Sequence, residues 1–272
     1  RQGGRRPAQS RPGGGARPSR PGGGAVIQVS EGVAEYLLAL ADDEHLMGQQ
    51  HTEWIGVAPF LEEDLAFSSI GQDELGHAAL VYALLAGDDD VAIDHLAFDR
   101  GADEYRSAWL VERLTTDWAE ALVRHWLYDS VEAIRWKLLA SSSIPELADV
   151  AARAAQEEAF HLRHANGLLD VLLVDADARP RLLTALQTML PLAVGLFDGV
   201  VGEAAAVAEG VAAHPLADHL DRWKDDVEAR FGPVDWPAGA PLQEARTVRS
   251  AEFGPLLARM REVFDYDPEA VW

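Results

Sequence analysis

The chain has 272 residues, of which 48% are hydrophobic and 25% charged, with no cysteine and a formal net charge of −22 at pH 7. This length and composition suit one large globular domain or two small ones. The absence of cysteine excludes disulfides, cysteine-ligated metal sites and thiol catalysis, and fits a reducing, cytoplasmic location. The negative charge argues against nucleic acid or an anionic membrane as a partner bound through a basic face.

Residues 1–25 consist mainly of Arg, Pro and Gly, and the segment RPGGG occurs in them twice. This composition cannot bury a core, so we predict a disordered tail over 1–25 followed by a helical domain over 26–272. The tail has no apolar stretch typical of a secretory signal. The most apolar later stretch, 182–208, is interrupted by Pro191, Asp198 and Glu203, so we expect no transmembrane helix.

From Ser30 onward, apolar residues recur at spacings of three and four, which is typical of amphipathic helices. The pattern predicts a first helix capped by Ser30, a break around 56–59, and a second helix from Leu61 to about Gly87. An acidic, irregular segment follows over 88–104. A third helix is expected over about 110–139 and a fourth over 146–173, with a turn at 141–145 in which Pro145 suits a first helical position.

Weaker helical patterns follow toward the C-terminus, at about 179–197, 200–213, 216–230 and 251–264. A segment rich in Pro and Gly, 232–241, is expected to be a loop. No convincing run alternates between apolar and polar residues as a strand would. We therefore predict an all-α protein built on a four-helix bundle with additional C-terminal helices.

Two Glu-x-x-His units stand out, Glu74–His77 and Glu158–His161. Residues three apart share a helix face, so one metal ion can contact both side chains. Each unit alone is more often a surface pair or a satisfied core histidine. Acids near the predicted first turn, namely Glu53, Glu62, Glu63 and Asp64, are expected to be solvated, and His45 points about 100° away from its neighbour Glu44.

The spacing of two further acids strengthens this signal. Glu44 precedes Glu74 by 30 residues, Asp129 precedes Glu158 by 29, and both midpoints fall in the predicted turns, at Pro59 and between 143 and 144. Residues equidistant from the turn of an antiparallel helical hairpin lie at the same height, here about 22 Å from it. Each hairpin therefore places one carboxylate level with one Glu-x-x-His, which suggests an internal duplication.

If the hairpins pack face to face, six ligands converge: Glu44, Glu74, His77, Asp129, Glu158 and His161. One carboxylate from each of two helices and Glu-x-x-His from each of the other two is the ligand pattern of ferritin-like dimetal sites. Four carboxylates offset two divalent ions, and the mixed oxygen and imidazole set suits two iron ions, with manganese possible. Burying these groups without metal would be costly. Glu132, one turn from Asp129, could replace it.

At these residues the chain resembles a known family. The segments ADDEHLMGQQHTEWIGVAP (41–59), LEEDLAFSSIGQDELGHA (61–78) and QEEAFHLRHANGLL (156–169) are similar to the ferritin-like subunits of bacterial phenylacetyl-CoA epoxidase. The whole run, with YDSVEAIRW (128–136), is most similar to the C subunit of that complex. The resemblance covers most of 33–205 and, more weakly, the C-terminal helix, but not the tail.

One departure from the pattern of the C subunit matters for function. That subunit is usually a structural partner in which Leu and Gln are common where this chain has Glu74 and His77, whereas the catalytic subunit keeps the ligands. This chain joins a body like that of the C subunit to the complete ligand set of the catalytic one. The match also favours Asp129 over Glu132. It raises the expectation of a catalytic rather than a structural role.

Two acids directly precede the ligand glutamates, Asp73 before Glu74 and Glu157 before Glu158. Histidine ligands usually donate their other N–H to a carboxylate. The resemblance to diiron oxygenases implies a crossed arrangement, in which Asp73 serves His161 and Glu157 serves His77. The alternative is that both acids face solvent.

The resemblance implies a non-heme diiron monooxygenase component, in which the six ligands carry catalysis. O₂ and an aromatic acyl-CoA would give a ring epoxide and water. The chain has no GxGxxG motif and no cysteine cluster, so a separate flavin and iron–sulfur reductase is implied, with another ferritin-like subunit or a homodimer. A basic patch around Arg135, Lys137 and Arg163, or a partner, would hold the CoA phosphates.

Two alternatives to the oxygenase belong to other functional classes. The chain could be a scaffold that retains a metal without turnover, which its similarity to the C subunit favours. Iron storage, as in ferritins, fits less well, because the chain is longer than a minimal ferritin-like bundle and carries an extra C-terminal region.

Overall fold

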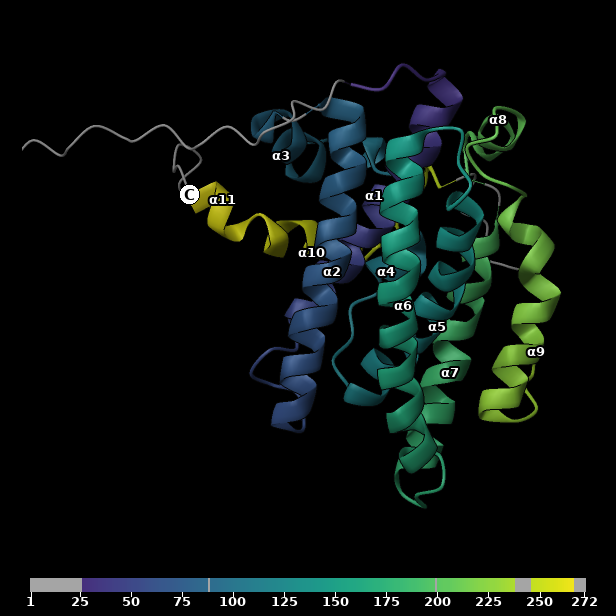
Figure 1. The fold of residues 1–272 in the computed structure, drawn as a ribbon. Coiled ribbons are helices and arrows are strands. Elements are labelled where there is room, and N and C mark those ends of the chain that lie inside the picture. The colour runs from purple at the N-terminus through teal and green to yellow at the C-terminus, as the bar shows by residue number, and fades with distance from the viewer. Residues whose placement is uncertain (1–25, 88, 199, 238–245, 267–272) are drawn as a thin grey trace, which may run out of the picture.

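Four long helices form the core of the protein in a computed structural model, which describes residues 26–87, 89–198, 200–237 and 246–266. They are α1 (Glu31–Thr52), α2 (Leu61–Ala86), α5 (Trp118–Leu139) and α6 (Pro145–Leu172) (Figure 1). The described part of the chain contains no strand, so the predicted all-α, ferritin-like bundle is confirmed. The tail that we predict to be disordered, 1–25, lies outside the described residues.

Two predicted helix starts are confirmed in atomic detail. The Ser30 side chain accepts a hydrogen bond from the backbone N–H of Val33 at 3.3 Å and so caps α1. Pro145 occupies the first position of α6, where its missing N–H has no intrahelical partner to lose. Both hairpin turns therefore lie close to where the spacing of the acids places them.

Shorter helices surround the bundle: α3 (Asp90–Phe98), α4 (Trp109–Glu112), α7 (Ala178–Val194), α8 (Glu203–Ala208), α9 (Leu220–Phe231), α10 (Phe253–Met260) and α11 (Glu262–Tyr266). Three 3₁₀ turns join them, Ala102–Glu104, Gly195–Phe197 and Leu216–His219. The segment Ala178–Phe197 is long and apolar enough to cross a membrane, but half of it is buried inside the protein, as in a core helix.

Several predicted boundaries are wrong. The segment 88–104, expected to be irregular, contains α3, which the Asp89 side chain caps by accepting from the Val91 N–H at 3.1 Å. The single helix predicted over 110–139 is two helices. Its second part, α5, begins anew at Asp117, whose side chain accepts from the Ala119 N–H at 2.7 Å. The helix expected over 200–213 is confined to α8, and the one over 251–264 is interrupted at Arg261.

A close approach of α1 and α2 fixes the register of the first hairpin. A Cβ atom added at Gly48 would lie 3.0 Å from the carbonyl oxygen of Gly71, and one added at Gly71 would lie 3.0 Å from that of Gly48. Only glycine at both positions lets the two backbones lie this close. The contact lies one turn from Glu44 and just before Glu74, so it sets the distance between these carboxylates.

A buried ion cluster ties the bundle to the C-terminal segment. The fully buried Asp43 carboxylate accepts from Arg135 Nη1 at 3.0 Å, from Arg246, and from the Ala108 N–H at 2.7 Å. Burial acts to raise the pKa of Asp43, but the two guanidinium groups and the amide outweigh it and hold this pKa below its usual value. The cluster joins α1, α5, the loop before α4 and the C-terminal segment.

Replacing Asp43 by alanine is expected to lower the free energy of unfolding by about 3–5 kcal/mol, because the buried Arg246 loses its carboxylate and Arg135 keeps only that of Glu132. Urea unfolding followed by circular dichroism measures this loss. Asp225→Ala, at an exposed position of α9, is the matched control and is expected to change the free energy by less than about 0.5 kcal/mol. Equal effects of the two substitutions would contradict the structural role of the cluster.

Candidate metal centre

The six residues predicted as ligands lie in two buried groups on the four long helices. One group is Glu44, His77 and Glu158, and the other is Glu74, Asp129 and His161. Within each group, one possible ligand atom from each residue lies within 4.8 Å of the others. All six residues are at most 2% exposed. The structure therefore brings together the whole set that the sequence analysis named.

Each group combines residues of both hairpins. His77 Nδ1 lies 2.8 Å from Glu44 Oε2 within the α1–α2 hairpin, and His161 Nδ1 lies 3.9 Å from Asp129 Oδ2 within the α5–α6 hairpin. The two remaining glutamates cross over, so that Glu158 of α6 joins the histidine of α2 and Glu74 of α2 joins the histidine of α6. This exchange places one imidazole and two carboxylates in each group.

Asp73 and Glu157, the acids next to the ligand glutamates, each contact the histidine of the opposite hairpin, as expected. Glu157 Oε2 lies 2.7 Å from His77 Nε2, and Asp73 Oδ2 lies 3.3 Å from His161 Nε2. Their side chains are 20% and 32% exposed, so neither acid simply faces solvent. Each histidine therefore meets a carboxylate at Nε2 and turns Nδ1 toward its group. A role for these acids in orienting a bound metal ligand stays a prediction.

Several polar atoms of the two groups are buried without a hydrogen-bond partner among the described residues. They are both oxygens of Asp129, both oxygens of Glu158, Glu74 Oε1 and His161 Nδ1. Native proteins seldom leave so many buried polar atoms unpaired, because each costs free energy. Other buried polar atoms, such as Arg124 Nε and Trp136 Nε1, also lack a partner, but the two groups gather carboxylates and imidazoles within 4.8 Å of one another. Four carboxylates with two imidazoles fit iron or manganese.

The pKa shifts of the carboxyl groups have the same origin. Burial, together with the neighbouring carboxylates, raises the pKa of Glu158 to about 8 and that of Glu74 well above its usual value. Burial also raises the pKa of Asp129 to about 8, although His161 opposes the shift. Bound cations would reverse these shifts, because metal ligands must lose their protons. The residues present therefore fit a pair of divalent ions.

The pKa values of the two candidate histidine ligands are raised, which favours their charged form. Burial acts to lower the pKa of His77, but its hydrogen bond to Glu44 outweighs burial and raises this pKa to about 9. Burial likewise opposes the shift of His161, whose contact with Glu158 raises its pKa to about 10. The two imidazolium groups offset part of the negative charge of the neighbouring carboxylates.

Comparison with known proteins identifies the family of the chain. Residues 26–272 match the family described as phenylacetic acid catabolic protein. The chain belongs to this family. Over 247 residues it is 31% identical to the C subunit of 1,2-phenylacetyl-CoA epoxidase from Escherichia coli (strain K12), a match that covers 87% of this chain and 98% of that protein. The resemblance to a ferritin-like subunit of this family, with a body like that of the C subunit, is thereby confirmed.

In this member of the phenylacetic acid catabolic protein family, the alternative acid Glu132 belongs to neither ligand group. It is fully buried and lies 3.1 Å from Arg135 Nη2, so it serves the ion cluster of Asp43. The expectation that Arg135 contributes to a surface patch for CoA is wrong. Its side chain is buried, because Asp43 and Glu132 hold the guanidinium inside the bundle.

The sequence analysis missed three buried side chains that contact the ligands. The Tyr128 hydroxyl donates to Glu44 Oε1 at 2.7 Å, His51 Nδ1 lies 2.6 Å from Glu74 Oε2, and His125 Nδ1 lies 2.9 Å from Asp129 Oδ2. Burial lowers the pKa of His125 to about 3 and that of His51 well below its usual value, so both are neutral. Spacing offered a signal, because His51 follows Glu44 by seven residues and His125 precedes Asp129 by four.

Two other expectations have different outcomes. Glu63, expected to be solvated, is only 6% exposed, because it lies on the inner side of α2 and its Oε2 is 2.8 Å from His164 Nε2. His45 is a core residue, as its angle to Glu44 allows. Its ring packs edge-on against Phe98, and burial lowers its pKa to about 3.

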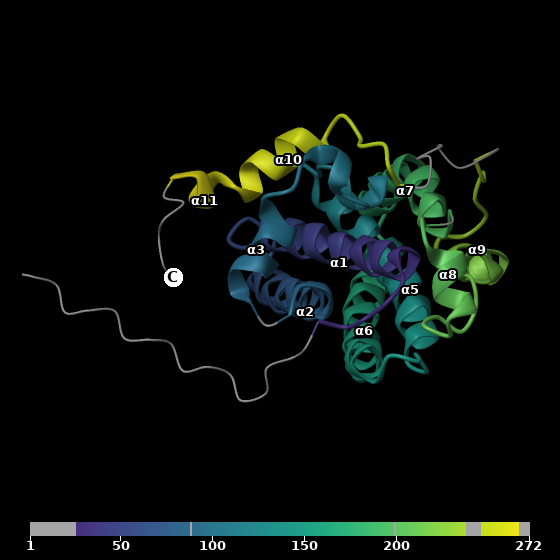
Figure 2. The same ribbon diagram turned by 90° about the horizontal axis from the view of Figure 1, so that it is seen from above.

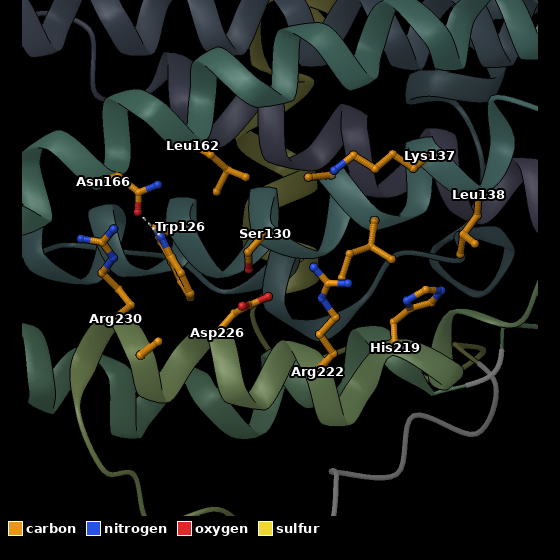
Figure 3. A pocket seen from close by; sticks show the side chains of 13 residues that line it. Trp126, Ser130, Lys137, Leu138, Leu162, Asn166, His219, Arg222, Asp226 and Arg230 are labelled. Carbon is orange, nitrogen blue, oxygen red and sulfur yellow. Dashed lines mark hydrogen bonds between the residues drawn. The ribbon is translucent and has the colours of Figure 1, made fainter.

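A groove of about 550 Å³ lies among α5, α6 and α9 (Figure 3). Trp126 and Leu162 contribute apolar surface, and Lys137 and Arg222 contribute positive charge. Leu162 directly follows the ligand His161, yet none of the six ligands lines the groove. The groove therefore runs beside the candidate metal centre without exposing it.

The stability of the metal-free protein is expected to fall as the pH rises from about 7 to 9. The folded-state pKa values of Asp129, Glu158, His77 and His161 all exceed their usual values, so the folded state binds more protons than the unfolded state across this window. Stability then decreases with rising pH. The depressed pKa of His51 acts in the opposite sense, but only below about pH 6.5.

We expect Tm to drop by about 5 °C over this interval in the metal-free form. The iron-loaded protein is expected to show little change, because its ligands are already deprotonated. Differential scanning calorimetry of both forms measures the effect. A rising Tm of the metal-free form between the two pH values would contradict the assignment.

Proposed function

We propose that the protein is a non-heme diiron oxygenase component that transfers one oxygen atom of O₂ to the ring of an aromatic acyl-CoA of the phenylacetyl-CoA type. The observation that carries the proposal is the pair of buried ligand groups with their unpartnered oxygen atoms. Membership of the phenylacetic acid catabolic protein family supports the substrate class. A cytoplasmic location and a separate flavin and iron–sulfur reductase are parts of the proposal.

Two iron ions, when bound, supply the reduction of O₂ and the transfer of the oxygen atom. The chain's own residues bind and orient. Glu74 and Glu158 tie the two hairpins together, because each joins the histidine of the opposite hairpin. Glu157 accepts the N–H of His77 Nε2, and Asp73 accepts that of His161 Nε2. The lone pair of each Nδ1 atom is then free to bind a metal ion.

Neighbouring side chains restrict the carboxylates and exclude water. The hydroxyl of Tyr128 fixes one oxygen of Glu44, and the neutral His51 fixes one oxygen of Glu74. Phe67, fully buried, packs edge-on against the His51 ring. Water is thereby kept from this side of the groups, and a dry site strengthens the electrostatic interactions of bound ions.

A turnover experiment tests the proposal. The iron-loaded protein, its reductase and an aromatic acyl-CoA are incubated with isotopically labelled O₂, and the product is analysed by mass spectrometry. We expect one labelled oxygen atom per product molecule. Glu74→Ala, assembled into the same complex, is expected to form no product above background, since the group of Asp129 and His161 loses its ligand from α2.

The second candidate is a scaffold that retains a metal without turnover, which the 31% identity to the C subunit of an epoxidase favours. The same experiment separates the two candidates. Unchanged product formation by a complex that contains Glu74→Ala would assign turnover to another protein of the complex. Loss of product from an intact complex supports the oxygenase.

Removing the carboxylate of Asp73 or Glu157, which contacts a histidine Nε2 atom, is expected to weaken iron binding by about 10- to 100-fold. In Asp73→Asn and Glu157→Gln, the shape of the side chain is kept, but the charged acceptor at histidine Nε2 is lost. Competition with a chromogenic chelator measures the affinity. Glu62→Gln, an exposed acid in the first turn of α2, is the control and is expected to bind iron as the wild type does. Wild-type iron affinity in both test variants would show that these two acids do not support the histidine ligands.

A further inference from the structure

Three histidines that belong to neither ligand group form a row beside the candidate metal centre. They are His51 of α1, His125 of α5 and His164 of α6. The ring centroids of His51 and His125 are 5.0 Å apart, and those of His125 and His164 are 5.7 Å apart. Each ring is therefore a direct neighbour of the next, and we call these three side chains the histidine row.

The inner end of the histidine row contacts candidate ligands. His51 Nδ1 lies 2.6 Å from Glu74 Oε2, and His125 Nδ1 lies 2.9 Å from Asp129 Oδ2. Both acids belong to the group that His161 completes. A cation bound by either inner histidine therefore has a ligand carboxylate within reach.

The outer end of the row lies at the edge of the bundle that α2 and α6 form. Seen from above, these two helices lie beside each other, with α1 and α5 on their inner side (Figure 2). Glu63 of α2 and His164 of α6 connect them, with 2.8 Å between Glu63 Oε2 and His164 Nε2. The side chain of His164 is 23% exposed, whereas those of His125 and His51 are fully buried. The row thus leads from a partly exposed pair to the buried ligands.

Packing alone does not explain histidine at these positions. All three rings lie around Phe67, with centroids 4.8 to 6.1 Å from its own, and an apolar ring would fill the same space. Yet His51 Nε2 and His164 Nδ1 are buried without a hydrogen-bond partner among the described residues, which costs free energy. Burial lowers the pKa of His164, as it does those of His51 and His125, so the rings are neutral and keep a lone pair for a cation.

Two other approaches to the centre suit a cation less well. At the seam of α2 and α6, the ligand histidines donate their Nε2–H groups to Asp73 and Glu157, so each ring turns a proton rather than a lone pair outward. Beside α5 and α9, Lys137 and Arg222 line the groove and repel positive ions. An ion that leaves water needs donor atoms at each step, because unpaired charge is costly to bury.

We propose that Glu63, His164 and His125 form the route by which divalent transition-metal ions such as Fe²⁺ enter the buried centre. Glu63 and His164 take the ion from solvent, where the net charge of −22 raises its local concentration. His125 then passes it to Asp129, and His51 is a second donor at the inner end. Carboxylate and imidazole donors suit these metals. The inference rests on the metal centre of the proposed function but not on its reaction.

Uptake of Fe²⁺ by the metal-free, full-length protein tests the route. The protein is mixed with Fe²⁺ in the absence of oxygen, and a chromogenic chelator added after increasing times measures the iron that is still free. His164→Phe keeps an aromatic ring but has no donor atom, so we expect uptake to be at least about 10-fold slower. Glu63→Gln is expected to slow uptake as well. Both variants should bind as much iron at equilibrium as the wild type.

His95→Phe is the matched control. His95 of α3 also lies near an acid, with 3.4 Å between its Nδ1 and Asp99 Oδ2, but its side chain is 60% exposed and it is not part of the row. Its variant is expected to take up iron at the wild-type rate. Circular dichroism of all variants should match that of the wild type.

The rate of iron release distinguishes a route from a ligand. A residue on the route changes uptake and release by the same factor, whereas a residue that supports the ligands speeds release. We therefore expect His164→Phe to lose iron to excess chelator at least about 10-fold more slowly than the wild type. Wild-type uptake in His164→Phe, or faster release from it, would overturn the proposal. A wild type that binds no iron would overturn both the centre and its route, whereas the rates test the route alone.

Discussion

Purified from iron-supplemented cells, the wild-type chain should carry about two iron ions, and Glu74→Ala and Glu158→Ala should each carry almost none. Each residue is the one ligand that the opposite hairpin supplies to its group, so either substitution breaks one group, and an ion pair that binds as a unit is then lost. Elemental analysis of the metal content measures the result. Loss of both ions from a single substitution is the mark of a dinuclear centre rather than of two independent sites.

Glu63→Gln is the matched control for this experiment. Glu63 is also a buried acid of α2, but it contacts His164 and belongs to neither ligand group. Its variant should keep the iron of the wild type. Wild-type iron content in Glu74→Ala and Glu158→Ala would disprove the assignment. A wild-type chain without metal would favour the scaffold, with a ligand set that is vestigial or needs a partner to form.

The ligand positions could be predicted because they depend on two regular quantities, the helical period and the distance from a turn. Glu44 and Glu74 are equidistant from the first turn, and Asp129 and Glu158 from the second. The structure accordingly brings the acid of each hairpin to the histidine of the same hairpin, with 2.8 Å between Glu44 and His77 and 3.9 Å between Asp129 and His161. These positions are fixed by local geometry that the sequence displays directly. The chemical role of the groups, unlike their convergence, stays a prediction.

The break between α4 and α5 could not be predicted, because distant residues hold it. The Leu114 N–H donates to Glu252 at 2.6 Å, and Glu112 accepts from Arg249 and from the Ser250 N–H, both at 2.7 Å. These partners lie more than 130 residues away in the sequence. The apolar pattern through 110–139 continues across the break, so helical periodicity alone gave no sign of it.

His51 and His125, two buried side chains that contact the candidate ligands, could not be predicted for a different reason. His51 and His125 share a helix face with the predicted ligands, but a face is broad enough to hold core and surface residues as well. Only the packing of α1 against α2 and α5 shows that His51 lies 2.6 Å from Glu74 and 5.0 Å, ring to ring, from His125. Sequence spacing selects candidates of this kind, and tertiary contacts decide among them.

Replacing Glu158 by leucine should stabilise the metal-free protein. Its carboxyl group is fully buried, neither oxygen has a hydrogen-bond partner among the described residues, and His161 Nδ1 is 3.6 Å away. Burial raises the pKa of this group to about 8, which means that the site disfavours its charge. An apolar side chain of similar size removes the cost of burying an unpaired polar group, about 1–3 kcal/mol.

Thermal unfolding of the metal-free proteins at pH 8 measures this gain, which we expect as a rise in Tm of about 3–8 °C. Glu157→Leu is the matched control at the next residue. Its carboxylate contacts His77 and Arg153, and although burial acts to raise its pKa, those contacts lower it, so its loss should reduce Tm. A lower Tm in Glu158→Leu would show that the carboxyl group is well satisfied without metal.

Iron binding should reverse the order of thermal stability of the wild type and Glu158→Leu. Ligands that bind only the folded state stabilise it by mass action, so iron should raise the Tm of the wild type. Glu158→Leu lacks the ligand that α6 supplies to the group of Glu44 and His77 and should gain nothing from iron. The variant that is more stable without metal should therefore be the less stable one with it, because the free energy spent on burying four acids is recovered only when cations bind them.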